Sequence, residues 1–219
     1  MKIRHLYDSV QKKYSLLRAY ENNFVRDLDV RGKGLDLGAK SEDAKYYEYL
    51  DMSKVKEMKF IDYFHSGPNI IKMDLEKPFP ILSDTYDFIF IFNVLEHIYN
   101  FQQLLSETYR ILSKEGSIHG FVPLMWRYHP DPNDYFRYTI EGLKRVMSAS
   151  GFLEIHVVPL AAGPFKVAVS SVAPLAKIKL MKFLIYSLGI FFDTLLQRIS
   201  NGNSTYALAY YFTGVKSRS

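Results

Sequence analysis

The sequence contains no cysteine and only one tryptophan among its 219 residues. The absence of cysteine excludes disulfide scaffolds, thiolate zinc sites, iron–sulfur clusters and cysteine nucleophiles, and it is compatible with a reducing compartment. Internal repeats and low-complexity tracts are also missing, and 48% of the residues are hydrophobic, enough to bury one core of ordinary size. We therefore expect one folded domain over residues 1–219, located in the cytoplasm.

Long hydrophobic runs and a strong charge excess are lacking as well. The longest strongly apolar run, residues 183–192, is bounded by Lys182 and Asp193, and it is shorter than the roughly 20 residues that a membrane-spanning helix needs. The net charge of +5 is compatible with an anionic membrane, with nucleic acid or with no special partner. Charge alone therefore selects no partner.

Apolar spacing predicts the order of the secondary structure. Residues 1–30 repeat apolar side chains at intervals of three, four and seven, which indicates one or two helices. Short apolar runs typical of buried strands occupy residues 34–37, 58–63, 70–73, 88–92, 118–122, 152–158 and 205–215. Asn100 and Thr139 can each cap a helix, and Gly151 suits a helix end. Alternating strands and helices predict an α/β fold with a parallel sheet covered on both faces.

A long apolar helix is expected at about residues 177–199, inside a helical insertion at about 160–203. Its polar stripe is narrow, and the apolar remainder is wider than a helix lying on one sheet requires. Two interpretations stay open: a deeply buried helix or homodimer contact, and docking on a membrane surface, which neighbouring lysines favour. The stripe comprises Lys179, Lys182, Tyr186, Asp193 and Gln197, and the flanking lysines are Lys177, Lys179 and Lys182.

The turn after the first strand has the chemistry of a nucleoside site. Gly38 permits close backbone approach, Ser41 can cap a following helix, and Asp62 ends the next strand at a separation suited to ribose hydroxyls. Glu42 and Asp43 would repel a phosphate, unless they only complement a helix dipole. A phosphate-free, positively charged adenosine derivative such as S-adenosylmethionine therefore fits better than a dinucleotide.

A succession of motifs strengthens this interpretation. They are DLEKPFP at residues 74–80, YDFIF at 86–90, NVLEHI at 93–98, YRIL at 109–112, then Gly116 and the pair Gly151 and Phe152. In order and spacing they resemble class I S-adenosylmethionine-dependent methyltransferases, especially the methyltransferase type 11 group and its branch of bacterial glycan or cell-envelope methyltransferases. The resemblance covers roughly residues 30–160.

The resemblance implies a Rossmann-like, mostly parallel seven-stranded sheet with helices on both faces and an antiparallel last strand. It also implies S-adenosyl-L-methionine as the cofactor, with an acid for the ribose, an acid beside the adenine and a strand-end backbone group for the ammonium. Each strand-end acid could instead be an ordinary turn or capping residue. The implied cofactor-binding residues are Asp36, Gly38, Ala39, Lys40, Asp62, Asp74, Leu75 and Asn93, with Lys40 standing where most relatives have a second glycine.

Aromatic and polar residues crowd the segment 126–139, where an α/β enzyme would hold its second substrate. His129 is the candidate general base, Asp134 or Asp131 can orient its ring, and Arg137 can hold an anionic group of the acceptor. The alternative is a rigid connection shaped by its prolines. Glu96 and His97 read as solvated turn residues, with acceptor contact by His97 as the other interpretation. The resemblance points to a small-molecule or glycan acceptor, including lipid-linked envelope precursors.

Other functions remain as alternatives. Nucleic-acid methylation is disfavoured because Asn93 is followed by Val94 and not by prolines, and because no basic stripe is visible. A non-catalytic Rossmann-like binding module, a methyltransferase for another small molecule and a nicotinamide oxidoreductase are the competing hypotheses. No metal site is expected.

Overall fold

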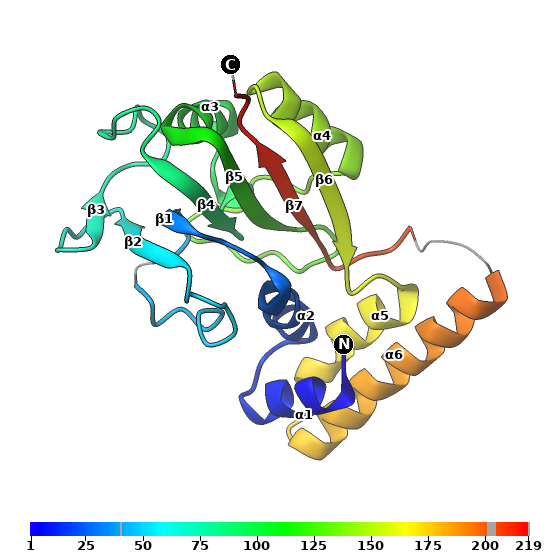
Figure 1. Ribbon diagram of the computed structural model, residues 1–219. Helices are drawn as coiled ribbons and strands as arrows, with labels where there is room; N and C mark the ends of the chain where they lie inside the picture. Colours follow the sequence, from blue (N-terminus) through cyan, green and yellow to red (C-terminus); the bar gives the residue numbers. More distant parts are fainter. Residues whose placement is uncertain (40, 201–204, 219) are drawn as a thin grey trace.

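The computed structural model describes residues 1–39, 41–200 and 205–218, and it contains one seven-stranded sheet (Figure 1). Strands β1 to β5 run parallel to one another, whereas β7 is antiparallel to both of its neighbours, β5 and β6. The order across the sheet is β3-β2-β1-β4-β5-β7-β6. The expected α/β, Rossmann-like sheet with an antiparallel last strand is confirmed. The strands are β1 (Gly32–Asp36), β2 (Val55–Asp62), β3 (Ile70–Lys72), β4 (Tyr86–Phe92), β5 (Leu112–Pro123), β6 (Leu153–Leu160) and β7 (Ala209–Val215).

Helices cover both faces of this sheet. Along β4 the side chains alternate, so that Phe88, Phe90 and Phe92 enter one core while Ile89 and Ile91 enter the other. The isoleucine side is closed by α3 (Phe101–Ile111) and α4 (Ile140–Ala149), and the phenylalanine side by α1 (Ile3–Gln11) and α2 (Leu16–Phe24). The 3₁₀ turns are η1 (Val25–Asp27), η2 (Leu95–His97) and η3 (Ala173–Leu175).

The predicted helix ends of α3 and α4 are confirmed in atomic detail. Asn100 Oδ1 accepts a hydrogen bond from the Gln103 amide at 3.4 Å, and Thr139 Oγ1 accepts one from the Gly142 amide at 3.1 Å. Gly151 follows α4 with a φ of +99°, a left-handed conformation that glycine adopts without steric cost. These caps fix where the two helices start and stop.

The helix expected after the first strand is absent. Residues 41–54 form successive turns, and Ser41 Oγ accepts from the Asp43 amide at 3.2 Å within such a turn. The prediction that Ser41 caps a helix is therefore wrong. Tyr46 and Leu50 fill the space that a helix would occupy, because both side chains are buried against the phenylalanine side of the sheet.

The segment 160–203 contributes two helices, α5 (Pro164–Val172) and α6 (Lys179–Ser200), which pack on each other (Figure 1). Residues 201–204 and Lys40 lie outside the described part of the chain. Proline at the first position of α5 starts that helix, since the missing amide of proline costs nothing there. The sequence analysis gave α5 no bounds of its own. The helices expected in residues 1–30 are present as α1 and α2, and the single-domain organisation stays a prediction.

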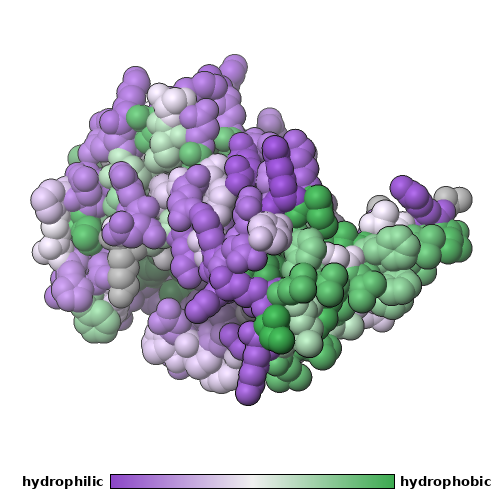
Figure 2. Space-filling view, turned by 90° about the horizontal axis from the view of Figure 1, so that it is seen from below, coloured by the Kyte–Doolittle hydropathy of each residue, from purple (hydrophilic) through white to green (hydrophobic). Residues whose placement is uncertain are grey.

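The orientation of α6 differs from expectation. Two members of its polar stripe, Tyr186 and Asp193, are buried against the rest of the protein, and the apolar side faces outward (Figure 2). Within the described residues, α6 is the one helix long and apolar enough to cross a membrane by length and composition. The most apolar 18-residue stretch of Lys179–Ile199 has a mean hydropathy of 1.3, and 17% of it is buried. A deeply buried helix is therefore excluded.

Candidate functional site

The turn after β1 is built around a buried carboxylate. Asp36 Oδ1 accepts from the amides of Gly38 and Ala39 at 2.8 and 3.0 Å, and Asp36 Oδ2 accepts from the hydroxyls of Tyr46 and Tyr47. Burial raises the pKa of Asp36, and these four donors oppose the rise. Asp36 is fully buried and borders neither of the cavities described below. Its visible role is to shape the turn, and its proposed cofactor contact stays a prediction.

A cavity of about 570 Å³ lies at the carboxyl ends of β1, β2 and β4. Gly38, Asp62, Asp74, Leu75 and Asn93, all expected to bind the cofactor, lie in its wall. Asp36 and Ala39 are buried and are not among its lining residues, and the eighth expected residue, Lys40, lies outside the described part of the chain. The strand ends thus bring five of the eight predicted residues together, as the position of ligand sites in open α/β sheets predicts.

The charges of this wall fit a cation without a phosphate. Asp62, Asp74, Glu76 and Asp131 border the cavity, and Lys77 is the one lysine or arginine among its described lining residues. Asp62 Oδ1 accepts from the amides of Phe64 and His65 at 2.7 and 2.8 Å, bonds that hold its carboxylate at the end of β2. The volume falls within the range of small-molecule sites. The donor set therefore suits S-adenosylmethionine, which carries a sulfonium and an ammonium group.

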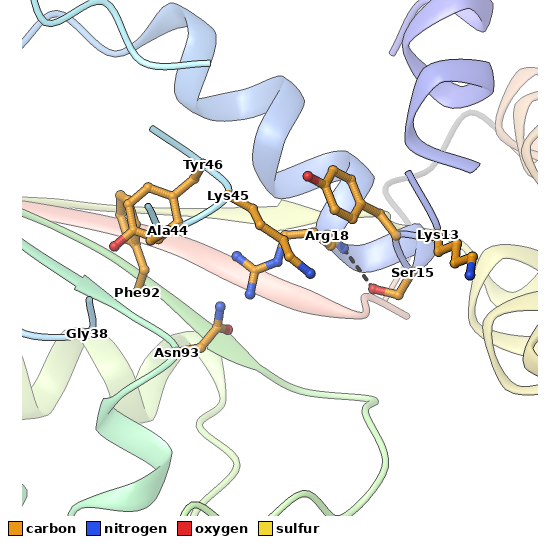
Figure 3. Close-up of a pocket in the computed structure, with 10 residues that line it drawn as sticks. Lys13, Ser15, Arg18, Gly38, Ala44, Lys45, Tyr46, Phe92 and Asn93 are labelled. Carbon is orange, nitrogen blue, oxygen red and sulfur yellow. Dashed lines mark hydrogen bonds between the residues drawn. The ribbon is translucent and has the colours of Figure 1, made fainter. Parts of the chain in front are cut away.

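A second cavity, of about 450 Å³, adjoins the first at Gly38 and Asn93 (Figure 3). Its other walls are the connection between α1 and α2, which contains Ser15, together with Arg18 of α2 and residues 44–46. Figure 3 shows Arg18 and Asn93 pointing toward one another across it. Asn93 has a φ of +55°, uncommon for a residue other than glycine and frequent at functional sites. The N-terminal helices thus form part of the site, which the sequence analysis did not foresee.

The expected acceptor residues form one bonded group. Arg137 donates to both carboxylate oxygens of Asp134, and the Asp134 carboxylate also accepts from the His129 amide at 2.9 Å. The guanidinium lowers the pKa of Asp134, and the neighbouring Glu96 carboxylate, followed by Asp134, raises the pKa of His129. Among the described residues of this loop, Asp131, Pro132 and Asn133 border the 570 Å³ cavity, whereas His129, Asp134 and Arg137 do not. Their catalytic role stays a prediction.

Glu96 is a residue that the sequence analysis misjudged. It is fully buried and not solvated, and neither carboxylate oxygen has a hydrogen-bond partner in the part of the chain that the structure describes. Glu96 Oε1 lies 3.6 Å from Nε2 of His129 and 3.7 Å from Nε2 of His97. His97 also lies in the wall of the 570 Å³ cavity. Glu96, His97 and His129 therefore form one cluster at the edge of the site.

Comparisons with known proteins agree with this geometry. Residues 32–119 match the family model described as a methyltransferase domain. No curated protein matches the sequence. The matched segment runs from β1 into β5 and contains every residue predicted to bind the cofactor.

Solved structures share the fold at low sequence identity. A S-adenosylmethionine-dependent methyltransferase from Archaeoglobus fulgidus superposes with a TM-score of 0.57 and 15% identity, over 95% of this chain and 97% of that one. The phosphoethanolamine N-methyltransferase 2 of Haemonchus contortus, in complex with phosphomonomethylethanolamine and S-adenosylhomocysteine, gives 0.56 and 15%, over 90% of this chain and 52% of that one. This chain thus spans about half the length of that enzyme.

The [4+2]-cyclase SpnF also shares the fold, with a TM-score of 0.56 and 12% identity over 92% of this chain and 82% of that one. A cyclase among these neighbours means that the fold alone does not define the reaction. The match of residues 32–119 to a methyltransferase domain is a separate observation from the fold, and it confirms the expected cofactor, S-adenosylmethionine. Residues 32–119 therefore match a methyltransferase domain, and the chain shares the fold of S-adenosylmethionine-dependent methyltransferases.

Proposed function

We propose that this protein transfers a methyl group from S-adenosylmethionine to a saccharide or lipid-linked saccharide. The observation that carries the proposal is the acid-lined cavity at the ends of β1, β2 and β4, three strands that the segment matching the methyltransferase domain contains. A methyltransferase for another small molecule is the second candidate, because an enzyme with a similar fold binds phosphomonomethylethanolamine, which is not a saccharide.

The residues of the cavity have distinct tasks in this proposal. Asp62 binds the ribose hydroxyls, Asp74 and Leu75 border the adenine, and the backbone of Asn93 meets the ammonium group. The cofactor supplies an electrophilic methyl group on a positively charged sulfur. The protein then needs only to align the acceptor with that methyl group and to exclude water, which can provide most of the rate enhancement.

The acceptor side is supported by aromatic rings that follow the lining residues Ile98 and Asn133 in the chain. Tyr99 and Tyr135 are 66% and 44% exposed, and their ring centroids lie 5.3 Å apart. Such faces suit sugar rings. Because His129, Asp134 and Arg137 bond to one another, we assign them the task of holding the loop that carries Asp131 and Asn133 against the cavity. A cytoplasmic location, at the inner face of a membrane, is part of the same proposal.

Binding of S-adenosylhomocysteine tests the cofactor site. Isothermal titration calorimetry should show saturable binding to the parent protein and at least tenfold weaker binding to Asp62→Asn and Asp74→Asn. Asp84→Asn is the control, since this exposed carboxylate pairs with Lys216 and lies outside both cavities. NAD should not bind. A parent protein that binds no S-adenosylhomocysteine would favour a non-catalytic module.

Transfer itself is tested with S-adenosylmethionine labelled in its methyl group, incubated with the protein and extracts of the cells that make it. Mass analysis of the labelled product then identifies the acceptor. A labelled saccharide or lipid-linked saccharide supports the proposal. A labelled metabolite of another class favours the second candidate, and labelled nucleic acid contradicts both.

A further inference from the structure

We propose that Glu96, His97 and His129 form a binding site for a divalent metal ion, with Zn²⁺ as the best match. The inference concerns a second ligand, goes beyond methyl transfer and does not depend on it. Each residue offers one ligand atom, and the three atoms lie within 4.8 Å of one another. Two imidazoles and one carboxylate are a ligand set typical of zinc, with a further position left for water or substrate.

The buried carboxylate is the first argument. Glu96 is fully buried, and both of its oxygens lack a hydrogen-bond partner among the described residues. A buried charge in that state is costly, so a carboxylate is retained only where a proton, a cation or a metal ion compensates it. The nearest candidates are the two Nε2 atoms, at 3.6 and 3.7 Å, too far for hydrogen bonds.

The second argument comes from the other nitrogen of each ring. His97 Nδ1 bonds to the carbonyl oxygen of Asn133. His129 Nδ1 lies 3.1 Å from the carbonyl oxygen of Arg127 and 3.2 Å from Asp134 Oδ2, with Arg137 Nη2 farther away at 3.4 Å. Oxygens only accept, so each Nδ1 carries a proton, and Nε2 is the nitrogen of each ring that faces Glu96 and is left to bind a metal ion. Metal-ligating histidines are typically held in this way by a carboxylate or carbonyl oxygen.

The distances support an ion between these atoms. Zinc bonds of 2.0–2.2 Å at a tetrahedral angle separate neighbouring ligand atoms by about 3.4 Å. The observed separations from Glu96 Oε1, 3.6 and 3.7 Å, need only a small contraction. Since His97 borders the 570 Å³ cavity, a metal ion here would lie where a second substrate enters.

Calorimetric titration of the metal-free protein with ZnCl₂ tests the site. The parent protein should bind one Zn²⁺, and Glu96→Gln, His97→Gln and His129→Gln should each bind it at least tenfold more weakly. His156→Gln is the matched control, because His156 lies exposed on β6. Because three variants are compared, the test still works if one of them fails to fold. Equal binding by the parent and all three variants, or none by the parent, overturns the proposal.

A crystal soaked with Zn²⁺ adds a structural readout, with an anomalous peak expected between the three ligand atoms and a peak elsewhere counting against the site. S-adenosylhomocysteine should bind Glu96→Gln as tightly as the parent protein. Loss of S-adenosylhomocysteine binding by the parent would overturn the proposed function and leave the metal result intact, so the two can fail separately.

A different observation carries a second inference. We infer that the outward side of α5, η3 and α6, here called the apolar face, docks on an anionic lipid surface. Figure 2 shows this side as a continuous hydrophobic area, and contiguous exposed apolar patches often mark interaction sites. Its exposed side chains include Leu180, Leu184, Leu188, Phe191, Leu195 and Ile199 on α6, spaced three and four residues apart.

Buried polar bonds hold this face outward. Asp193 accepts from the amides of Phe165 and Lys166 at 3.0 and 2.7 Å, and its carboxylate lies 3.4 Å from Lys166 Nζ. Both partners of this ion pair are buried. Turning α6 to bury its apolar side would break these contacts at the start of α5 and would expose the pair. The outward orientation is therefore built into the packing of the two helices.

The charged residues around the apolar face indicate that it docks on a membrane and not on a second copy of the protein. Asp193 is the one acid within residues 161–200, and it is buried, while Lys177, Lys179 and Arg198 are exposed at the two ends of α6. A second copy of the face would bring bases against bases with no acid to pair them. An anionic membrane offers the opposite charge at its surface and hydrocarbon beneath it, as interfacial amphipathic helices require.

Flotation with vesicles tests this inference. The protein should float with vesicles of phosphatidylcholine and phosphatidylglycerol, and at least fivefold less with phosphatidylcholine alone. Leu188→Glu combined with Phe191→Glu should abolish flotation, whereas Leu82→Glu, at an 83% exposed leucine of the β3–β4 loop, should not change it. Equal flotation with neutral vesicles, or a dimer in lipid-free buffer that the double variant dissociates, overturns the inference.

Discussion

Asn93, at the end of β4, donates through Nδ2 to Glu21 Oε1 of α2 at 3.0 Å, although 72 residues separate them in the sequence. Arg18 Nη1 lies 3.1 Å from the other oxygen of Glu21, so a buried carboxylate joins both side chains. The second helix thereby holds the residue that both cavities share. The N-terminal helices belong to the site through this contact.

Removing the contact should weaken both the fold and the site. Glu21→Ala leaves Asn93 and Arg18 without their acceptor, and we expect a loss of about 2 kcal/mol in the free energy of unfolding. Binding of S-adenosylhomocysteine should weaken in parallel. Glu21→Gln keeps one acceptor oxygen, so chemical denaturation and calorimetry should show smaller losses. Equal stability of the parent and Glu21→Ala would mean that α2 is held by its apolar side alone.

The donors around Asp36 make a second prediction. Tyr47→Phe removes one of four hydrogen bonds to this buried carboxylate, and we expect the free energy of unfolding to fall by about 1–2 kcal/mol. Tyr49→Phe is the matched control, because the Tyr49 hydroxyl accepts from Lys12 Nζ at 3.3 Å in an exposed contact and does not donate to a buried carboxylate. Urea unfolding of the two variants compares them directly, and similar losses would contradict the importance of the buried bond.

A third prediction concerns pH. Burial lowers the pKa of His119 to about 4, with Tyr211 Oη 2.6 Å from Nδ1 and Ser117 Oγ 2.9 Å from Nε2. An unfolded histidine titrates near 6.5, so between pH 6.5 and 4 the unfolded state binds the proton more tightly. Stability is complete above pH 6.5 and falls as the pH drops toward 4, by up to about 3 kcal/mol.

Denaturation between pH 4 and 7 checks the contribution of His119. His119→Gln should flatten the fall in the free energy of unfolding over this range, while the exposed His156→Gln should keep the slope of the parent protein. A slope unchanged by His119→Gln would assign the acid sensitivity to other groups.

The sheet could be predicted from the sequence because its strands are short apolar runs separated by capped helices, and both features are local. The strand-end acid Asp62 followed from the same logic, since parallel strands bring their carboxyl ends to one edge, whereas Asp74 came only from the resemblance to methyltransferases. The orientation of α6 did not follow. The usual rule buries the apolar side of a helix, and here the Asp193 bonds to the first turn of α5 decide otherwise.

Glu96 could not be recognised as buried for a related reason. A glutamate in a loop is usually solvated. Its burial is caused by residues about 40 positions later: the amides of Tyr135 and Phe136 donate to the Glu96 carbonyl at 2.8 and 3.3 Å, and the Tyr138 hydroxyl donates to the Leu95 carbonyl at 3.4 Å. These long-range bonds hold residues 126–139 over η2, and no local sequence pattern predicts them.

The anchor of the apolar face gives a fourth prediction. Asp193→Ala removes one partner of a buried ion pair and leaves Lys166 uncompensated, and we expect a loss of about 3 kcal/mol. Thr194→Ala, at the next and exposed position, should be nearly neutral because its hydroxyl bonds only to the Ile190 carbonyl within α6. Thermal unfolding measures both, and a neutral Asp193→Ala would show that apolar contacts alone position α6.

Metal removal should reverse the order of thermal stability of the parent protein and Glu96→Gln. Without a metal ion, the buried Glu96 carboxylate has no hydrogen-bond partner among the described residues and lies 3.6 and 3.7 Å from the two Nε2 atoms, so Glu96→Gln relieves the cost of burying a charge and should be at least as stable as the parent protein in EDTA. With Zn²⁺ at 100 times its dissociation constant, binding to the native state should stabilise the parent by about 2.7 kcal/mol. The variant lacks a ligand and gains less, so the parent should then unfold at the higher temperature. Thermal unfolding in EDTA and in Zn²⁺ measures the melting temperatures of both proteins. A reversal of their order in Zn²⁺ identifies Glu96 as a metal ligand. For a merely structural glutamate, the order would be the same in both conditions.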